Sequence, residues 1–101
     1  MQDLGPIGQR VHDKLRAAFS PWALVIVDES ARHAGHGGAV RADGTRGETH
    51  FRVRIVSEAF LGLSRVERQR RVYAALEDEM RAAVHALALV TLTPQEANAA
   101  P

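Results

Sequence analysis

The stretch from Val84 to Leu92 constrains the fold most strongly, because it is almost continuously apolar. A transmembrane helix needs about 20 apolar residues, so this stretch is too short to span a membrane. Its length and its β-branched residues predict a strand that is buried for much of both faces. His85 interrupts the apolar run at its start. It either hydrogen-bonds a neighbour at the entrance of the strand or has a chemical role.

The length of 101 residues predicts a single domain spanning residues 1–101. The formal net charge of +1 is too small to indicate nucleic acid or membrane binding by itself. The chain has no cysteine, which excludes disulfides and any metal site that takes thiolates from this chain. We find no secretory signal in the N-terminal sequence and no membrane-spanning segment, and therefore expect a cytoplasmic protein.

The first part of the chain predicts a helix followed by a strand. Apolar residues four positions apart form one stripe from about Ile7 to Phe19. Pro6 suits the first helical position, and Pro21 disfavours helical geometry in the residue before it. The run from Trp22 to Val27 is rich in β-branched residues and predicts the first strand.

A glycine-rich segment, residues 30–47, separates the first strand from the second. It contains five glycines and little apolar periodicity, so we predict a long loop, which also carries His33 and His36. The following residues, 48–57, alternate between apolar and polar side chains. This alternation predicts a strand with one face on the core and the other in water, paired antiparallel with the first strand.

A long helix, a third strand and a short helix complete the chain. Ser64 and Glu67 match the capping-box pattern, which begins a helix that we expect to continue to about Ala83. The helical spacing selects five core candidates: Val66, Tyr73, Leu76, Met80 and Ala83. The apolar strand follows, then a helix that begins at Thr93-Pro94 and a tail, residues 98–101, that is expected to fray. The order α-β-β-α-β-α predicts an α+β fold, a three-stranded mixed sheet with helices on one face.

The long helix has an unusual distribution of charge. Its first half is basic and its second half is acidic, which opposes the helix dipole. The arrangement suggests that the arginines serve something other than helix stability, although a solvated face with internal ion pairs explains it equally well. The four residues concerned are Arg65, Arg68, Arg70 and Arg71.

The histidines are the strongest candidates for chemistry. His33 and His36 on a glycine-rich loop can reach the same metal ion, and His85 adds a third ligand if the loop folds over the end of the sheet. A closed zinc site needs four ligands, and two histidines in a loop are usually just solvated. We find no nucleophile elbow, no His-Glu-x-x-His helix and no phosphate-binding glycine loop before a helix.

Four stretches together resemble the BolA family. They are DESARHAGH, GETHFRVRIVSEAF, FLGLSRVERQRRVYAALEDEM and VHALALVTLTPQE, and ETHFRV followed by HALAL is a specific combination. The resemblance extends from the first helix to Pro94. It implies a fold similar to the class II KH domain, in agreement with the element order given above.

The resemblance also implies a protein that is not an enzyme. BolA proteins pair with monothiol glutaredoxins and share a [2Fe–2S] cluster with them, in iron–sulfur cluster trafficking and iron homeostasis. By this likeness His85 matches the family's constant ligand and His33 matches the ligand from the loop, with His36 as its competitor. The glutaredoxin and its glutathione would supply the sulfurs within a heterodimer, and we expect the free protein to be monomeric.

Two other functions remain open from the sequence. Proteins of this family have also been described as DNA-binding transcriptional regulators, and Arg65, Arg68, Arg70 and Arg71 would then form a local basic surface. Many members carry Arg-His-Arg where this chain has Arg68-Gln69-Arg70, so this chain lacks that histidine and any role it plays in those members. The third alternative is a zinc-binding or purely structural interaction module.

Overall fold

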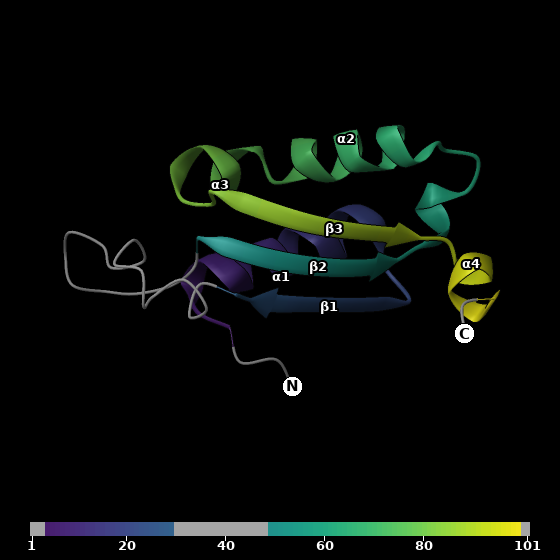
Figure 1. Cartoon of the computed structure of the whole chain (residues 1–101), viewed down its shortest axis with the longest axis horizontal. Coiled ribbons are helices and arrows are strands. Elements are labelled where there is room, and N and C mark those ends of the chain that lie inside the picture. Colours follow the sequence, from purple (N-terminus) through teal and green to yellow (C-terminus); the bar gives the residue numbers. More distant parts are fainter. Residues whose placement is uncertain (1–3, 30–48, 100–101) are drawn as a thin grey trace.

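The computed structural model describes residues 4–29 and 49–99. Three strands form one sheet in the order β1-β2-β3. They are β1 (Ala23–Asp28), β2 (His50–Val56) and β3 (Ala86–Leu92). β1 pairs antiparallel with β2, and β2 pairs parallel with β3, which confirms the predicted mixed sheet (Figure 1).

The helices follow the predicted order, with one addition and one break. Helix α1 (Pro6–Phe19) lies behind the sheet in Figure 1. The 3-10 helix η2 (Glu58–Phe60) follows β2, and α4 (Pro94–Ala99) follows β3. The predicted long helix is two helices, α2 (Arg65–Ala75) and α3 (Glu77–Ala82). Residues 98 and 99, which we expected to fray, belong to α4.

The break between α2 and α3 changes the meaning of the charge distribution. Leu76 leaves helical geometry and forms the junction, and its side chain is 1% exposed. Glu77, Asp78 and Glu79 therefore occupy the first turn of a new helix, where negative charge is favourable. Glu79 is buried and pairs with Lys14 of α1 at 3.0 Å. The expectation that these acidic residues oppose the helix dipole was wrong, because they stand at a helix N-terminus.

The core lies between α1, the inner face of the sheet and the helices that follow β2. The predicted stripe of α1 is buried, and the inward side chains of β2 are almost fully buried beneath it. Two predicted core residues, Val66 and Tyr73, are instead 59% and 38% exposed. The buried core residues are Ile7, Val11, Leu15, Phe19, Ile26, Phe51, Val53, Ile55, Phe60, Val72, Leu76 and Val84.

Strand β3 is less buried than its sequence predicted. Leu87 and Leu89 pack against the core, whereas Ala88 and Val90 point outward and are exposed. The prediction that this strand is buried on much of both faces was therefore wrong. Small and β-branched side chains suit a pleated strand whether or not a second layer covers them, so composition alone did not distinguish the two cases.

Ser57 connects three elements at the carboxyl end of β2. Its side chain is fully buried, and its hydroxyl donates to the carbonyl oxygen of Phe19 at 2.6 Å. The same hydroxyl accepts the backbone N–H of Ala59 at 3.0 Å. The backbone N–H of Ser57 donates to the carbonyl of Leu92 at 2.9 Å. One small polar residue thus joins the end of α1, the start of η2 and the end of β3.

We expect Ser57→Ala to lower the free energy of unfolding by about 2 kcal/mol, because it leaves a buried carbonyl and a backbone N–H without partners. Ser64→Ala, which removes the exposed cap of α2, is the matched control and should cost about 1 kcal/mol. Urea denaturation measures both variants. A smaller loss for Ser57→Ala than for Ser64→Ala would contradict the role given to Ser57.

Candidate functional site

His85 lies exposed at the end of the sheet where β2 and β3 begin. It directly precedes β3, and its backbone N–H donates to the carbonyl oxygen of Thr49 at 2.7 Å. The N–H of Ala86 donates to the same oxygen at 3.2 Å. Two hydrogen bonds from consecutive residues therefore fix the backbone that carries the imidazole of His85. The sequence left open whether His85 hydrogen-bonds a neighbour or has a chemical role. In the structure its backbone is hydrogen-bonded, and its side chain is exposed to solvent.

A second histidine stands beside it. The rings of His50 and His85 are stacked, with centroids 6.4 Å apart and planes 13° from parallel. His50 is the first residue of β2, and its Nδ1 lies 2.9 Å from the hydroxyl of Thr49. The alternation of residues 48–57 puts His50 on the polar face of its strand but does not indicate that another histidine lies beside it. The parallel register, which sets His50 opposite Ala86, is what brings the two imidazoles together.

The predicted loop ligands, His33 and His36, lie outside the described residues. The residues that flank their segment are described, however, and both belong to this end of the sheet. The backbone N–H of Glu29 donates to the carbonyl of His50 at 2.8 Å, and Thr49 is bonded to His85. The connection between β1 and β2 therefore leaves and re-enters the sheet beside the two stacked histidines.

At this end of the sheet the side chains that could bind a metal are the imidazoles of His50 and His85, and the chain has no cysteine to add a thiolate. Within residues 4–29 and 49–99, no three His, Cys, Asp or Glu side chains converge as a metal site would require. A [2Fe–2S] cluster needs four ligands, and two histidines can hold one of its irons when thiolates hold the other. His50 and His85 thus fit two of the four ligands of such a cluster. The chain has no cysteine to supply the other two.

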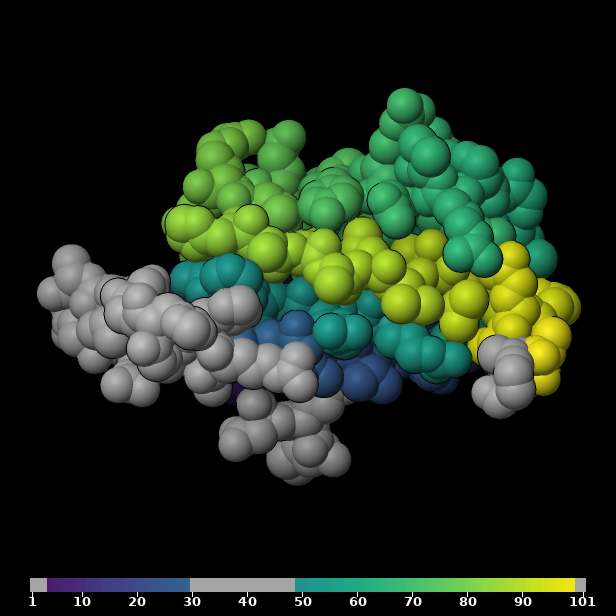
Figure 2. All heavy atoms as spheres, in the orientation of Figure 1, coloured from purple at the N-terminus to yellow at the C-terminus, as the bar shows by residue number. Residues whose placement is uncertain are grey.

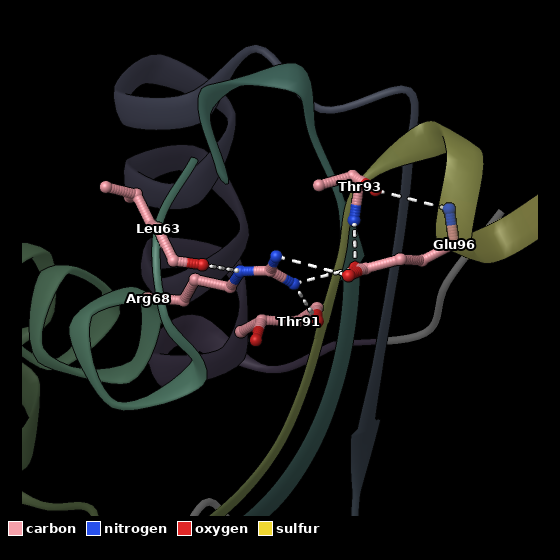
Figure 3. A network of polar contacts seen from close by, with 5 residues as sticks. All are labelled: Leu63, Arg68, Thr91, Thr93 and Glu96. Atoms are coloured by element: carbon pink, nitrogen blue, oxygen red, sulfur yellow. Dashed lines mark hydrogen bonds and ion pairs between the residues drawn. The ribbon is translucent and has the colours of Figure 1, made fainter. Parts of the chain in front are cut away.

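The structure separates Arg68 from the other arginines of α2. Its side chain is 7% exposed, and its guanidinium points into the protein (Figure 3). Nε donates to the carbonyl of Leu63 at 3.0 Å, and Nη1 donates to that of Thr91 at 3.2 Å. Nη1 and Nη2 reach the two carboxylate oxygens of Glu96 at 2.7 and 3.2 Å. Arg68, predicted to bind a partner or nucleic acid, instead fastens α4 to α2 and β3.

Glu96 is held from a second side by Thr93. The backbone N–H of Thr93 donates to the carboxylate at 2.8 Å, and the backbone N–H of Glu96 donates to the hydroxyl of Thr93 at 3.2 Å. These reciprocal bonds form a capping box at the start of α4. Hydrogen bonds from Arg68, and then from the backbone of Thr93, lower the pKa of Glu96 to about 2.

The remaining predicted arginines, Arg65, Arg70 and Arg71, are exposed on α2. Glu67 lies between two of them, 3.7 Å from Arg70 and 3.3 Å from Arg71. Surface pairs of this kind contribute little to stability. The helix therefore has the internal ion pairs expected of a solvated charged face. Its three exposed guanidinium groups also remain accessible to a binding partner.

Comparison with known proteins decides the family. The model described as BolA-like protein matches residues 15–96, which include β1 to β3 and His85. The chain belongs to the BolA-like family. The match includes the whole sheet, so the resemblance identified from the sequence is confirmed.

Relatives of this BolA-like chain carry different printed names. It is 45% identical over 93 residues to SufE-like protein 1 of Arabidopsis thaliana, covering 92% of this chain and 25% of that protein. It is 45% identical to BOLA1 of the same plant, named chloroplastic, over 86% of this chain and 53% of the relative. The chain thus spans a quarter to about half of these two proteins. Identity to the Escherichia coli DNA-binding transcriptional regulator BolA is 43%, over 89% of this chain and 78% of that protein.

Solved structures agree with the fold. The BolA domain of SufE1 from Arabidopsis thaliana has a TM-score of 0.80 at 44% identity, covering 93% of this chain and 99% of that one. BolA1 from the same plant has a TM-score of 0.77 at 37% identity, covering 97% and 100%. Among the described residues, no helix has the length and apolar character required to cross a membrane.

The lowered pKa of Glu96 makes its contribution to stability depend on pH in the acidic range. A carboxyl whose pKa is lower in the folded state stabilises the fold above about pH 4.5 and loses that contribution as the pH falls toward about 2. We expect Glu96→Gln to be less stable than the wild type near pH 7, with the difference closing over this acidic range. Urea denaturation at a series of pH values measures the difference. Glu77→Gln, at an exposed pair with Arg81, is the control and should show little change.

Proposed function

We propose that this BolA-like chain is a non-enzymatic adaptor that pairs with a monothiol glutaredoxin and contributes histidine ligands to a shared [2Fe–2S] cluster. The observation that carries the proposal is the exposed His85 beside a second imidazole, in a chain without cysteine. Imidazole is a suitable iron ligand, and the partner's cysteine with its glutathione would contribute the sulfur ligands. Such a heterodimer acts in iron–sulfur cluster trafficking.

The chain's own part in this function is to present imidazole in a fixed position. The two hydrogen bonds to Thr49 set the backbone of His85, so the ring projects from a rigid strand end. A ligand whose backbone is already ordered loses less conformational entropy when the cluster binds. Three histidines are candidates for the second ligand. His33 and His36 are proposed from the family likeness, and His50 is added by its position 6.4 Å from His85.

The test of the first ligand is the visible spectrum of the complex with a reconstituted monothiol glutaredoxin. Wild-type protein should change the spectrum and form a one-to-one complex, whereas His85→Ala should abolish the spectral change. His12→Ala, on α1 and engaged with Asp13, is the matched control and should behave as the wild type. An unchanged spectrum with His85→Ala would refute the proposal, and tight zinc uptake without glutaredoxin would favour the zinc module.

The second ligand can be assigned by the same measurement on three single variants, His33→Ala, His36→Ala and His50→Ala. The true ligand should alter the spectrum when removed, and the other two variants should retain it. Because imidazole binds a metal only through an unprotonated nitrogen, the wild-type complex should weaken below about pH 6. A complex that is equally stable at about pH 5 would argue against ligation by histidine.

Regulation of transcription is the second candidate, and one observation favours it. The Escherichia coli relative is named a DNA-binding transcriptional regulator, and this chain exposes Arg65, Arg70 and Arg71 on α2. Three phosphate contacts predict a slope of about −3 in a plot of log binding constant against log salt concentration. Filter binding or fluorescence anisotropy with duplex DNA measures this slope. A flat salt response would exclude the exposed arginines as a DNA-binding surface.

A further inference from the structure

The outer face of the sheet has an ordered pattern of charge and apolar surface. It is the face toward the viewer in Figure 2, where blue β1, teal β2 and yellow-green β3 are visible side by side. Its central rungs follow from the strand register. Val27, Arg52 and Ala88 form one rung, and Val25, Arg54 and Val90 form the next. We call these six residues the outer patch.

The patch is exposed although half of it is valine. Val25, Val27 and Val90 are 46%, 44% and 45% exposed, and the other three residues are also exposed. On the following rung, by contrast, Val56 is 3% exposed. The exposed surface along β2 therefore ends before Val56. Apolar strips along β1 and β3 lie on either side of a row of guanidinium groups.

The two arginines of the patch differ in their electrostatic state. Arg52 pairs with Glu29, with its Nε 3.0 Å from the carboxylate. Arg54 has no ion pair within the described residues, and its neighbours in the register are Val25 and Val90. An arginine flanked by apolar side chains on both sides is a favourable place for a carboxylate, because a covering partner removes water and strengthens the interaction.

We propose that the outer patch binds an amphipathic helix of a partner protein, with an acidic side chain at the centre of the helix's apolar face. Residues two apart on a strand are separated by about 6.7 Å, and residues four apart on a helix by about 6 Å. A helix lying along β2 can therefore place one carboxylate over Arg54, with the residue four positions away over the existing pair of Arg52 and Glu29. The apolar residues beside them would cover the valines of β1 and β3. This surface uses none of the proposed cluster ligands.

Other occupants fit the patch less well. Its six residues include no aromatic side chain on which bases could stack. Within residues 4–29 and 49–99 only one of its two cations lacks an ion pair, so single-stranded nucleic acid gains little. A second copy of the chain placed face to face on a two-fold axis would bring like guanidinium groups together. A partner helix with one acidic residue inside an apolar stripe matches both Arg54 and the apolar strips on either side of it.

The test uses two synthetic helical peptides of equal length and apolar pattern. One has a single glutamate at the centre of its apolar face, and the other has glutamine at that position. The glutamate peptide should shift the backbone amide NMR signals of Val25, Val27, Arg54 and Val90 in the isotope-labelled full chain. Replacing glutamate by glutamine should weaken binding roughly tenfold.

Charge reversal separates a specific contact from general attraction. Arg54→Glu should weaken binding of the glutamate peptide by more than roughly tenfold, and a lysine version of the peptide should restore it. Arg70→Glu makes the same change of charge on exposed α2 and should leave the affinity within about twofold. Thermal unfolding verifies that both exposed variants fold.

Three outcomes would overturn the proposal. The first is signal shifts confined to α2, the second is equal binding of the two peptides, and the third is unchanged affinity of Arg54→Glu for the glutamate peptide. Each would show that the outer patch does not bind a helix through an acidic side chain. Single-stranded oligonucleotide or anionic phosphatidylserine vesicles are titrated in parallel. If either binds through Arg54 more tightly than the glutamate peptide does, the patch serves that class of ligand instead.

Discussion

The parallel pairing of β2 with β3 is the constraint on which the rest of the structure depends. Parallel strands begin at the same end of a sheet, so this pairing puts His50 opposite Ala86 and its ring beside that of His85. It also requires a crossover connection, which η2, α2 and α3 provide. A slip of one residue in the register would send every side chain of β3 to the opposite face. The stacked histidines and the core therefore depend on one set of backbone hydrogen bonds.

The crossover also protects the outer edge of β3. An edge strand exposes backbone groups that can pair with another chain. Arg68 donates to the carbonyl of Thr91, and Tyr73 donates to the carbonyl of Leu87 at 3.2 Å. The contact with Leu87 explains why Tyr73, which the helical spacing assigned to the core, is partly exposed beside the strand edge. Arg68, expected to bind a partner, lies beside the same edge. Arg68 additionally binds Glu96, so the same side chain fixes α4 at the end of the sheet.

Elements were predicted well where one periodicity dominated. The stripe of α1 and the alternation of β2 gave the correct faces, because neighbouring residues determine those patterns. The break at Leu76 was missed because Leu76 keeps the helical spacing of the core while its backbone leaves the helix. The burial of Arg68 depends on Glu96, 28 positions away, and nothing local signals that contact. His85 was found as a site residue from its place in an apolar run, whereas His50 needed the register.

The exposed valines of the outer patch would not by themselves indicate a partner. β-branched residues favour strands through backbone and packing preferences, so a valine on an open face has an adequate local explanation. Arg54 is different, because strand propensity does not require a guanidinium between two valines. The charge of Arg52, by comparison, is balanced within the chain by an ion pair with Glu29, which follows the last residue of β1. The next rung has no equivalent acidic residue at its register positions, only Val25 and Val90. A carboxylate brought by another molecule would compensate Arg54, and the flanking valines give that molecule an apolar surface to cover.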